Sequence, residues 1–183
     1  MSFTHDTEMS LVAAAALVNT ISDDDGELLP DPAALEAFRV KFQWSGRIDG
    51  TEEELEQVRA LRPRLRRIWT ADEVEVVEIV NELLREFQAL PQLVRHDKWP
   101  YHLHATPMDS PFAVRIAVDA AMGFVDVVRD EQLDRLRICE FPTCDNVVVD
   151  LTRNRSKRFC EAGCGNRAAV NAYRARKAAA TRS

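Results

Sequence analysis

The sequence lacks a hydrophobic run long enough to cross a bilayer. The longest such run, Leu11–Val18, has eight residues, whereas a membrane-spanning helix needs about 20. The acids Asp6 and Glu8 precede this run, at the place where a signal peptide would carry positive charge. We therefore expect no membrane partner and a cytoplasmic location.

Sequence motifs of catalysis are missing as well. With only six glycines in 183 residues, the chain shows no nucleophile elbow, no phosphate-binding loop and no metal-binding helix motif. No acid–base pair of side chains stands out either. We therefore do not expect an enzyme.

Acidic residues are almost absent from the last 33 positions, although the whole chain has a net charge of −6. Residues 151–183 contain nine basic residues and one acid, Glu161, which gives +8. The preceding 150 residues contain 15 basic and 29 acidic residues, which gives −14. This division predicts a tail that binds a polyanion, attached to an acidic body.

The first 130 residues predict a mainly helical domain. Pro63 should kink or split the second of the capped helices, and the alternating segment "YHLHA" between prolines predicts a short β-hairpin. A long apolar helix should then follow Ser110-Pro111. Three N-terminal capping signals predict the starts of helices: Asp31 before Pro32, Thr51 before Glu54, and Asp72 before Glu75.

A ligand pocket in this body is one hypothesis. His102 and His104 alternate and would face one side of a strand, although such a pair is more often a hydrogen-bonded core histidine beside a surface one, and we favour that explanation. The candidate pocket residues are Asn19, Arg39, His102 and His104. The body would then sense a small-molecule effector or form a homodimer.

Four cysteines form two close pairs, Cys139-x4-Cys144 and Cys160-x3-Cys164, with fifteen residues between them. This spacing is typical of a structural zinc site, and four sulfur ligands leave no open coordination position. In a reducing compartment metal ligation is favoured over disulfides. Four unrelated buried cysteines are the alternative; a redox dithiol is disfavoured because neither pair is Cys-x-x-Cys.

The residues around the cysteines predict a treble-clef-like finger of knuckle, β-hairpin and helix. "CEFPTC" suits a knuckle, and Val147–Val149 should pair with a returning strand at residues 157–159 across a polar turn. The second cysteine pair should lie at the N-terminus of a helix, where the helix dipole favours thiolate charge. Without zinc, residues 139–178 should be largely disordered.

The segments "DLTRNRSKRFC" and "CGNRAAVNAYRARK" resemble the bacterial CGNR zinc-finger family. Its members join the finger to an N-terminal ABATE-type domain and are described as stress-induced transcription regulators. The resemblance implies that Cys139, Cys144, Cys160 and Cys164 hold one structural Zn²⁺. It also implies a helical ABATE-like domain at residues 1–132 and a finger at 133–183.

The basic tail is the candidate nucleic-acid surface, with duplex DNA as its expected partner. Arg167, Asn171 and Arg174 share one helix face, as a major-groove reader requires. For Asn166 we favour hydrogen bonding to the knuckle instead, and Arg167 suits either role. A module that binds RNA or protein, without DNA sequence specificity, is the alternative function. The candidate contact residues are Arg153, Arg155, Lys157, Arg158, Arg167, Asn171, Arg174, Arg176 and Lys177.

Overall fold

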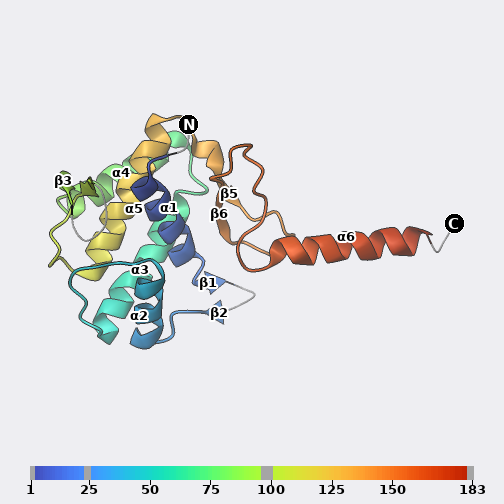
Figure 1. Cartoon of the computed structure of the whole chain (residues 1–183), viewed down its shortest axis with the longest axis horizontal. Helices are drawn as coiled ribbons and strands as arrows, with labels where there is room; N and C mark the ends of the chain where they lie inside the picture. The colour runs from blue at the N-terminus through green and yellow to red at the C-terminus, as the bar shows by residue number, and fades with distance from the viewer. Residues whose placement is uncertain (1–2, 23–25, 96–100, 181–183) are drawn as a thin grey trace.

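A computed structural model describes residues 3–22, 26–95 and 101–180 of the chain. In this part of the chain a helical body carries a small finger on one side, and a last helix projects from the finger (Figure 1). The body contains α1 (His5–Val18), α2 (Pro32–Lys41), α3 (Glu52–Arg67), α4 (Glu73–Glu86) and α5 (Phe112–Arg129). The mainly helical fold class is therefore confirmed.

The three capping signals are confirmed as helix starts. The side chain of Asp31 accepts from the N–H of Ala34 (2.8 Å) at the start of α2. Thr51 caps α3 and Asp72 caps α4 through the same kind of bond, at 3.2 and 2.9 Å. Each bond satisfies a main-chain donor that the first turn of a helix leaves unpaired.

Pro63 does not split its helix, because α3 is continuous from Glu52 to Arg67. A proline cannot donate to the carbonyl four residues before it, here that of Arg59. The side-chain Nε of Arg62 donates to this carbonyl instead, at 3.3 Å. The neighbouring arginine therefore compensates for the missing donor.

Helices α1 and α5 form the centre of the core. Leu11, Leu17, Phe112 and Phe124 have no exposed surface. At Gly123 in α5, an added Cβ would lie 3.3 Å from the side chain of Leu11. The absence of a side chain at this position lets the two helices pack closely.

The strands are short. The predicted hairpin in the body is confirmed as β3 (Gln92–Val94) paired antiparallel with β4 (His102–His104). A second pair, β1 (Ile21–Ser22) with β2 (Gly26–Glu27), follows α1. None of the described helices is long and apolar enough to cross a membrane.

The hairpin of the finger differs from the prediction. Strand β6 (Val147–Val149) pairs with β5 (Leu136–Ile138), which follows the short 3-10 helix η1 (Leu133–Arg135) and precedes the first cysteine. Residues 157–159 form no strand. The first cysteine pair therefore lies in the connection between the two strands.

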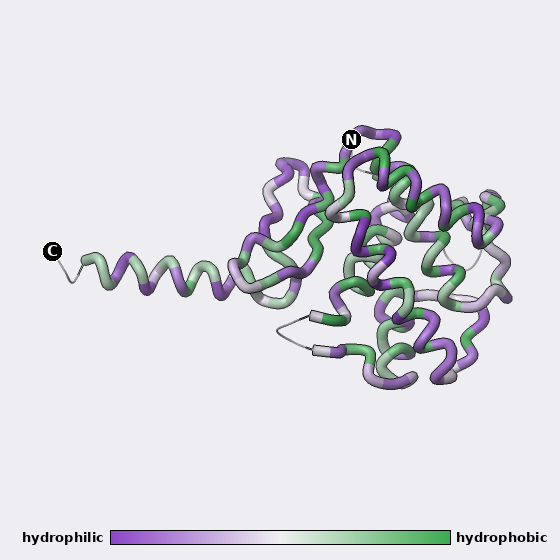
Figure 2. The backbone as a smooth tube through the Cα atoms, turned by 180° about the vertical axis from the view of Figure 1, so that it is seen from behind, coloured by the Kyte–Doolittle hydropathy of each residue, from purple (hydrophilic) through white to green (hydrophobic). Residues whose placement is uncertain are grey.

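The last helix, α6 (Cys164–Ala180), stands clear of the body along most of its length (Figures 1 and 2). Every residue from 169 to 180 is exposed. Because most of the stability of a helix in a protein comes from packing and not from propensity, the base of α6 in the finger must hold it in place.

Candidate metal centre and basic helix

The four cysteine sulfurs converge between β5, β6 and the start of α6. Cys139 follows β5, Cys144 precedes β6, and Cys164 is the first residue of α6. All four Sγ atoms lie within 4.8 Å of one another, with Cys144 and Cys160 at 3.7 Å and Cys160 and Cys164 at 3.5 Å. The second pair thus lies at a helix N-terminus, as the sequence predicted.

The geometry fits one tetrahedral zinc ion. With zinc–sulfur bonds of about 2.3 Å, tetrahedral ligands lie about 3.8 Å apart, close to the 3.7 Å between Cys144 and Cys160 and the 3.5 Å between Cys160 and Cys164. Burial raises the pKa of the Cys144 thiol, so a cation would have to displace its proton. Because four sulfurs complete the tetrahedron, the site can stabilise structure and has no position left for a substrate.

Polar groups surround the sulfurs as donors. The N–H of Cys160 points to the sulfur of Cys139 (3.4 Å), and the amide of Asn146 points to that of Cys160 (3.5 Å). Arg167 donates to the sulfur of Cys164 at 2.9 Å. Donors of this kind offset the negative charge of a four-thiolate site.

Arg167 also packs on an aromatic ring. Its guanidinium lies over Phe141, 4.5 Å from the ring centroid, and Phe141 belongs to the "CEFPTC" knuckle. Arg167 therefore links α6 to both cysteine pairs. Of its two predicted roles, support of the knuckle is the one for which the structure gives direct contacts.

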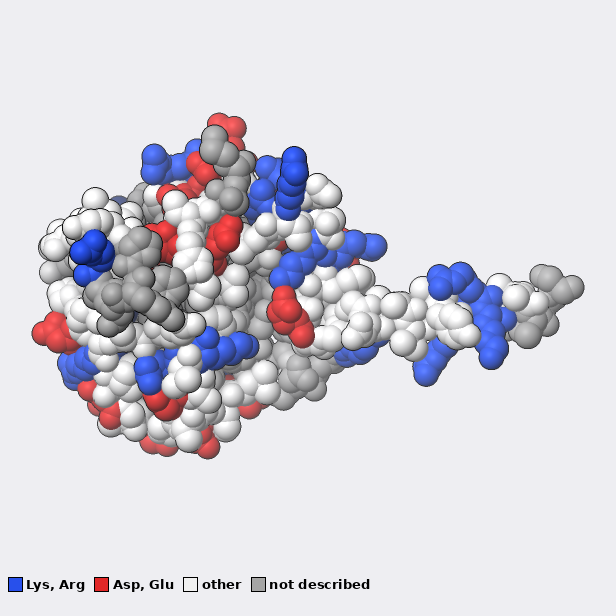
Figure 3. All heavy atoms as spheres, in the orientation of Figure 1, with Lys and Arg blue, Asp and Glu red and all other residues white. Residues whose placement is uncertain are grey.

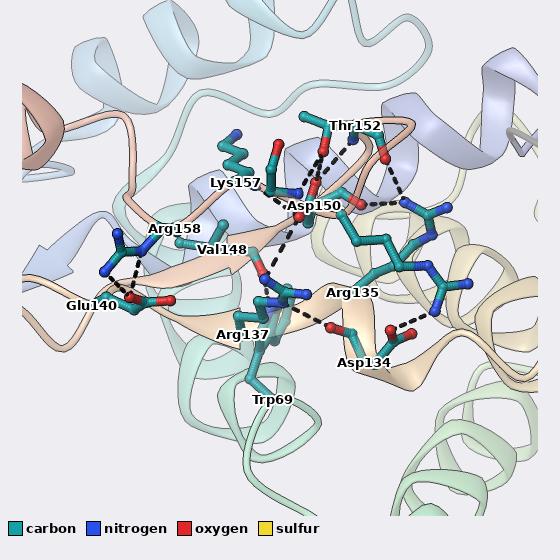
Figure 4. Close-up of polar contacts among 12 residues, drawn as sticks. Trp69, Asp134, Arg135, Arg137, Glu140, Val148, Asp150, Thr152, Lys157 and Arg158 are labelled. Atoms are coloured by element: carbon teal, nitrogen blue, oxygen red, sulfur yellow. Dashed lines mark hydrogen bonds and ion pairs between the residues drawn. The ribbon is translucent and has the colours of Figure 1, made fainter.

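The polar turn after β6 is organised by one buried carboxylate, that of Asp150 (Figure 4). It accepts from the N–H groups of Thr152 (2.9 Å) and Lys157 (2.8 Å) and from the Thr152 hydroxyl. Arg137 lies 3.8 Å away. These hydrogen bonds, which outweigh the effect of burial, keep the pKa of Asp150 below its usual value.

The basic residues of this turn mostly face acids of the same module. Arg155 pairs with Asp134, Lys157 with Glu161 (2.7 Å), and Arg158 with Glu140 (2.6 Å). All three are partly or largely exposed, so each pair contributes little to stability.

Three other predicted contact residues, one in the turn and two on α6, face no carboxylate among the described residues. Arg153 in the turn, and Arg174 and Arg176 on the helix, form no ion pair with the residues that the structure describes. Asn171 and Lys177 also lie on the exposed part of the helix. In Figure 3 the outer part of α6 carries basic side chains among uncharged ones.

The finger is anchored to the body through the main chain around β6. The amide of Asn19 donates to the carbonyl of Val147 and accepts from its N–H, both at 2.8 Å. Trp69 donates to the carbonyl of Val148 at 3.0 Å (Figure 4), and Arg66 donates to the carboxylate of Asp145 at 2.8 Å. Sequence reasoning missed this interface, because no local pattern links residues so far apart.

The apolar side of the same hairpin joins the core of the body. Leu136, Val147 and Val149 belong to the hydrophobic cluster that contains the five body helices. Val148 points the other way and packs with the cysteines and Phe141. Strand β6 thus connects the helical core to the metal centre.

The four residues predicted for a ligand pocket do not line one cavity. Asn19 is bonded to β6. Arg39 borders a hollow of about 340 Å³ with Glu36, Glu54 and apolar residues of α2, of the loop before α3 and of α5. None of the other three lines this hollow. His102 and His104 contact one another, Nε2 to Nε2, at 2.9 Å.

Two family models match the chain in the order of these parts. The ABATE model, described as "Putative stress-induced transcription regulator", matches residues 11–131, and the CGNR zinc-finger model matches residues 135–177. The protein is therefore a zinc-finger protein built on a helical domain, and the chain belongs to the ABATE family. Among curated proteins, no sequence matches it.

Proposed function

We propose that this protein is a DNA-binding transcription regulator whose zinc finger presents α6 to duplex DNA. The observation that carries the proposal is the charge of this helix: four basic residues, no acid after Glu161, and an exposed surface from residue 169 onward. A cationic helix whose residues 169–180 are exposed suits a groove lined with phosphates. The family description supports the same function.

We further propose that the protein acts by binding and not by catalysis. A four-sulfur site gives zinc a structural role, and the sequence contains no motif for a reaction. The acidic body would serve as a sensor of an effector, as a dimerisation unit, or as both. Its direct hydrogen bonds to β6 support a coupling of body and finger.

The test is fluorescence anisotropy of labelled random duplex DNA with the full-length zinc-loaded protein, at about 50 and about 200 mM salt. Binding that weakens steeply with salt is expected, because each phosphate contact contributes about 0.9 to the slope of log K against log salt. Single-stranded RNA is the comparison ligand. If the duplex does not bind even at low salt, the DNA-binding proposal is wrong.

Light scattering of the same sample tests the dimer. A particle of twice the 20.7 kDa chain mass would support a dimerisation role for the body. A monomer at every concentration would leave effector sensing as its proposed role.

A further inference from the structure

We infer that one particular face of α6, beside the metal centre, holds a phosphodiester of the DNA backbone, an inference that rests on the proposed function. A hollow of about 340 Å³ lies there, between the first knuckle and the helix. Its lining consists of Phe141, Asn166, Arg167, Val170, Asn171 and Arg174. No acidic residue lines it, so its charge is complementary to a phosphate.

The inner wall of this hollow is fixed by the metal centre. Arg167 is held between the sulfur of Cys164, at 2.9 Å, and the ring of Phe141, at 4.5 Å from the centroid. Because these contacts already fix the Arg167 side chain, little conformational entropy is lost there when a ligand binds, which favours affinity. The folding of the finger therefore shapes the hollow before DNA arrives.

Arg174 supplies the charge for the ligand. It lies two turns after Arg167 on the same side of α6, it is exposed, and it forms no ion pair with any described residue. Lys157 and Arg158 of the turn are different, because they already face carboxylates. An arginine can meet a phosphate with two parallel hydrogen bonds.

The remaining lining suits the sugar–phosphate chain. Asn166 and Asn171 bring amide groups that can donate to phosphate oxygens. Phe141 and Val170 offer apolar surface to the deoxyribose, and Val170 is 46% exposed. Charge, amide donors and an apolar wall thus meet in one place.

The helix itself provides the control. Arg176 lies two residues beyond Arg174, carries the same charge, is also exposed, and has no ion-pair partner among the described residues. At about 100° per residue it points about 200° away from Arg174 around the helix. It is not part of the hollow.

The experiment compares Arg174→Ala with Arg176→Ala in the full-length, zinc-loaded protein, by anisotropy with random duplex DNA at several salt concentrations. We expect Arg174→Ala to weaken binding about tenfold and to lower the salt slope by about 0.9, since one phosphate contact is lost. Arg176→Ala should change both quantities much less. Asn171→Ala should weaken binding without changing the slope.

Equal losses from the two arginine variants would overturn the inference, because they would show diffuse attraction to the whole helix while leaving DNA binding itself intact. A larger loss from Arg176→Ala would place the contact on the opposite face and overturn it too. Failure of the unmutated protein to bind DNA is a separate result that rejects the proposed function. Zinc content and circular dichroism of both variants should match those of the unmutated protein, since neither arginine touches the cysteines.

Discussion

The side chain of Asn19 pairs with both main-chain groups of Val147, at 2.8 Å each, across 128 positions of sequence. Its amide thus binds β6 as a neighbouring strand would. This contact lies where α1 ends and joins the helical body to the zinc finger. The orientation of the finger on the body depends on such contacts, since the covalent link alone would leave it free to turn.

We predict that Asn19→Ala destabilises the protein by about 1–3 kcal/mol, because it removes two hydrogen bonds and leaves the N–H and carbonyl of Val147 unpaired. Urea unfolding followed by circular dichroism measures the change. Asn19→Asp should be at least as harmful, since it places a second oxygen against the Val147 carbonyl. Asn171→Ala, on the exposed helix, is the control and should leave the free energy of unfolding unchanged.

Zinc removal should destabilise the body as well as the finger. Leu136, Val147 and Val149 pack in the same core as the body helices, so loss of the finger exposes apolar surface of the body. Thermal unfolding with and without a chelator should show a lower Tm for the whole chain, and Cys160→Ser should reproduce this shift. A body transition at an unchanged Tm would show two independent domains and contradict the shared core.

Arg167 should matter for metal affinity. Arg167→Ala removes the donor to the Cys164 sulfur and the stacking on Phe141, and we expect zinc affinity to fall about 10- to 100-fold. Arg167→Lys keeps the charge without the planar stack and should recover only part of the loss. Competition with a coloured chelator measures both.

The matched control for this experiment is Arg174→Ala, which changes the same residue type two turns away. Its zinc affinity should equal that of the unmutated protein. An equal loss in both variants would mean that the charge of the helix, and not the contact with Cys164, sets the affinity.

Stability should fall as pH rises from about 4 to about 7 because of Asp119 in α5. Burial raises the pKa of this carboxyl to about 7, against the smaller opposing effect of Arg115. The folded state therefore binds a proton more tightly than the unfolded state, and this advantage is lost between about pH 4 and pH 7. The full effect is at most on the order of 4 kcal/mol.

Asp119→Asn should flatten this dependence, which thermal unfolding across the pH range would reveal. Glu36 is the comparison, because the hydrogen bond from Arg39 lowers its pKa. Glu36→Gln should lower stability slightly at neutral pH and converge with the unmutated protein at acidic pH, where the contribution of a carboxyl with a depressed pKa is lost. An Asp119→Asn protein with an unchanged pH profile would show that this carboxyl does not titrate near neutrality.

The sequence by itself determined the local features of the protein. The caps at Asp31, Thr51 and Asp72 act within three residues, and the start of α6 at Cys164 depends on the helix formers that follow it. The spacing of the four cysteines likewise defined the metal site, because close pairs can share one ion only if the chain between them folds back.

Tertiary structure decided the partners of these elements. Sequence patterns favoured a partner for β6 at residues 157–159, whereas burial of Val147 and Val149 against the helical core pairs it with β5. Asn19, which was predicted to line a ligand pocket, instead forms hydrogen bonds with this strand. Pairing of strands and docking of domains depend on the total apolar surface removed from water, a property of the whole chain that no local pattern contains.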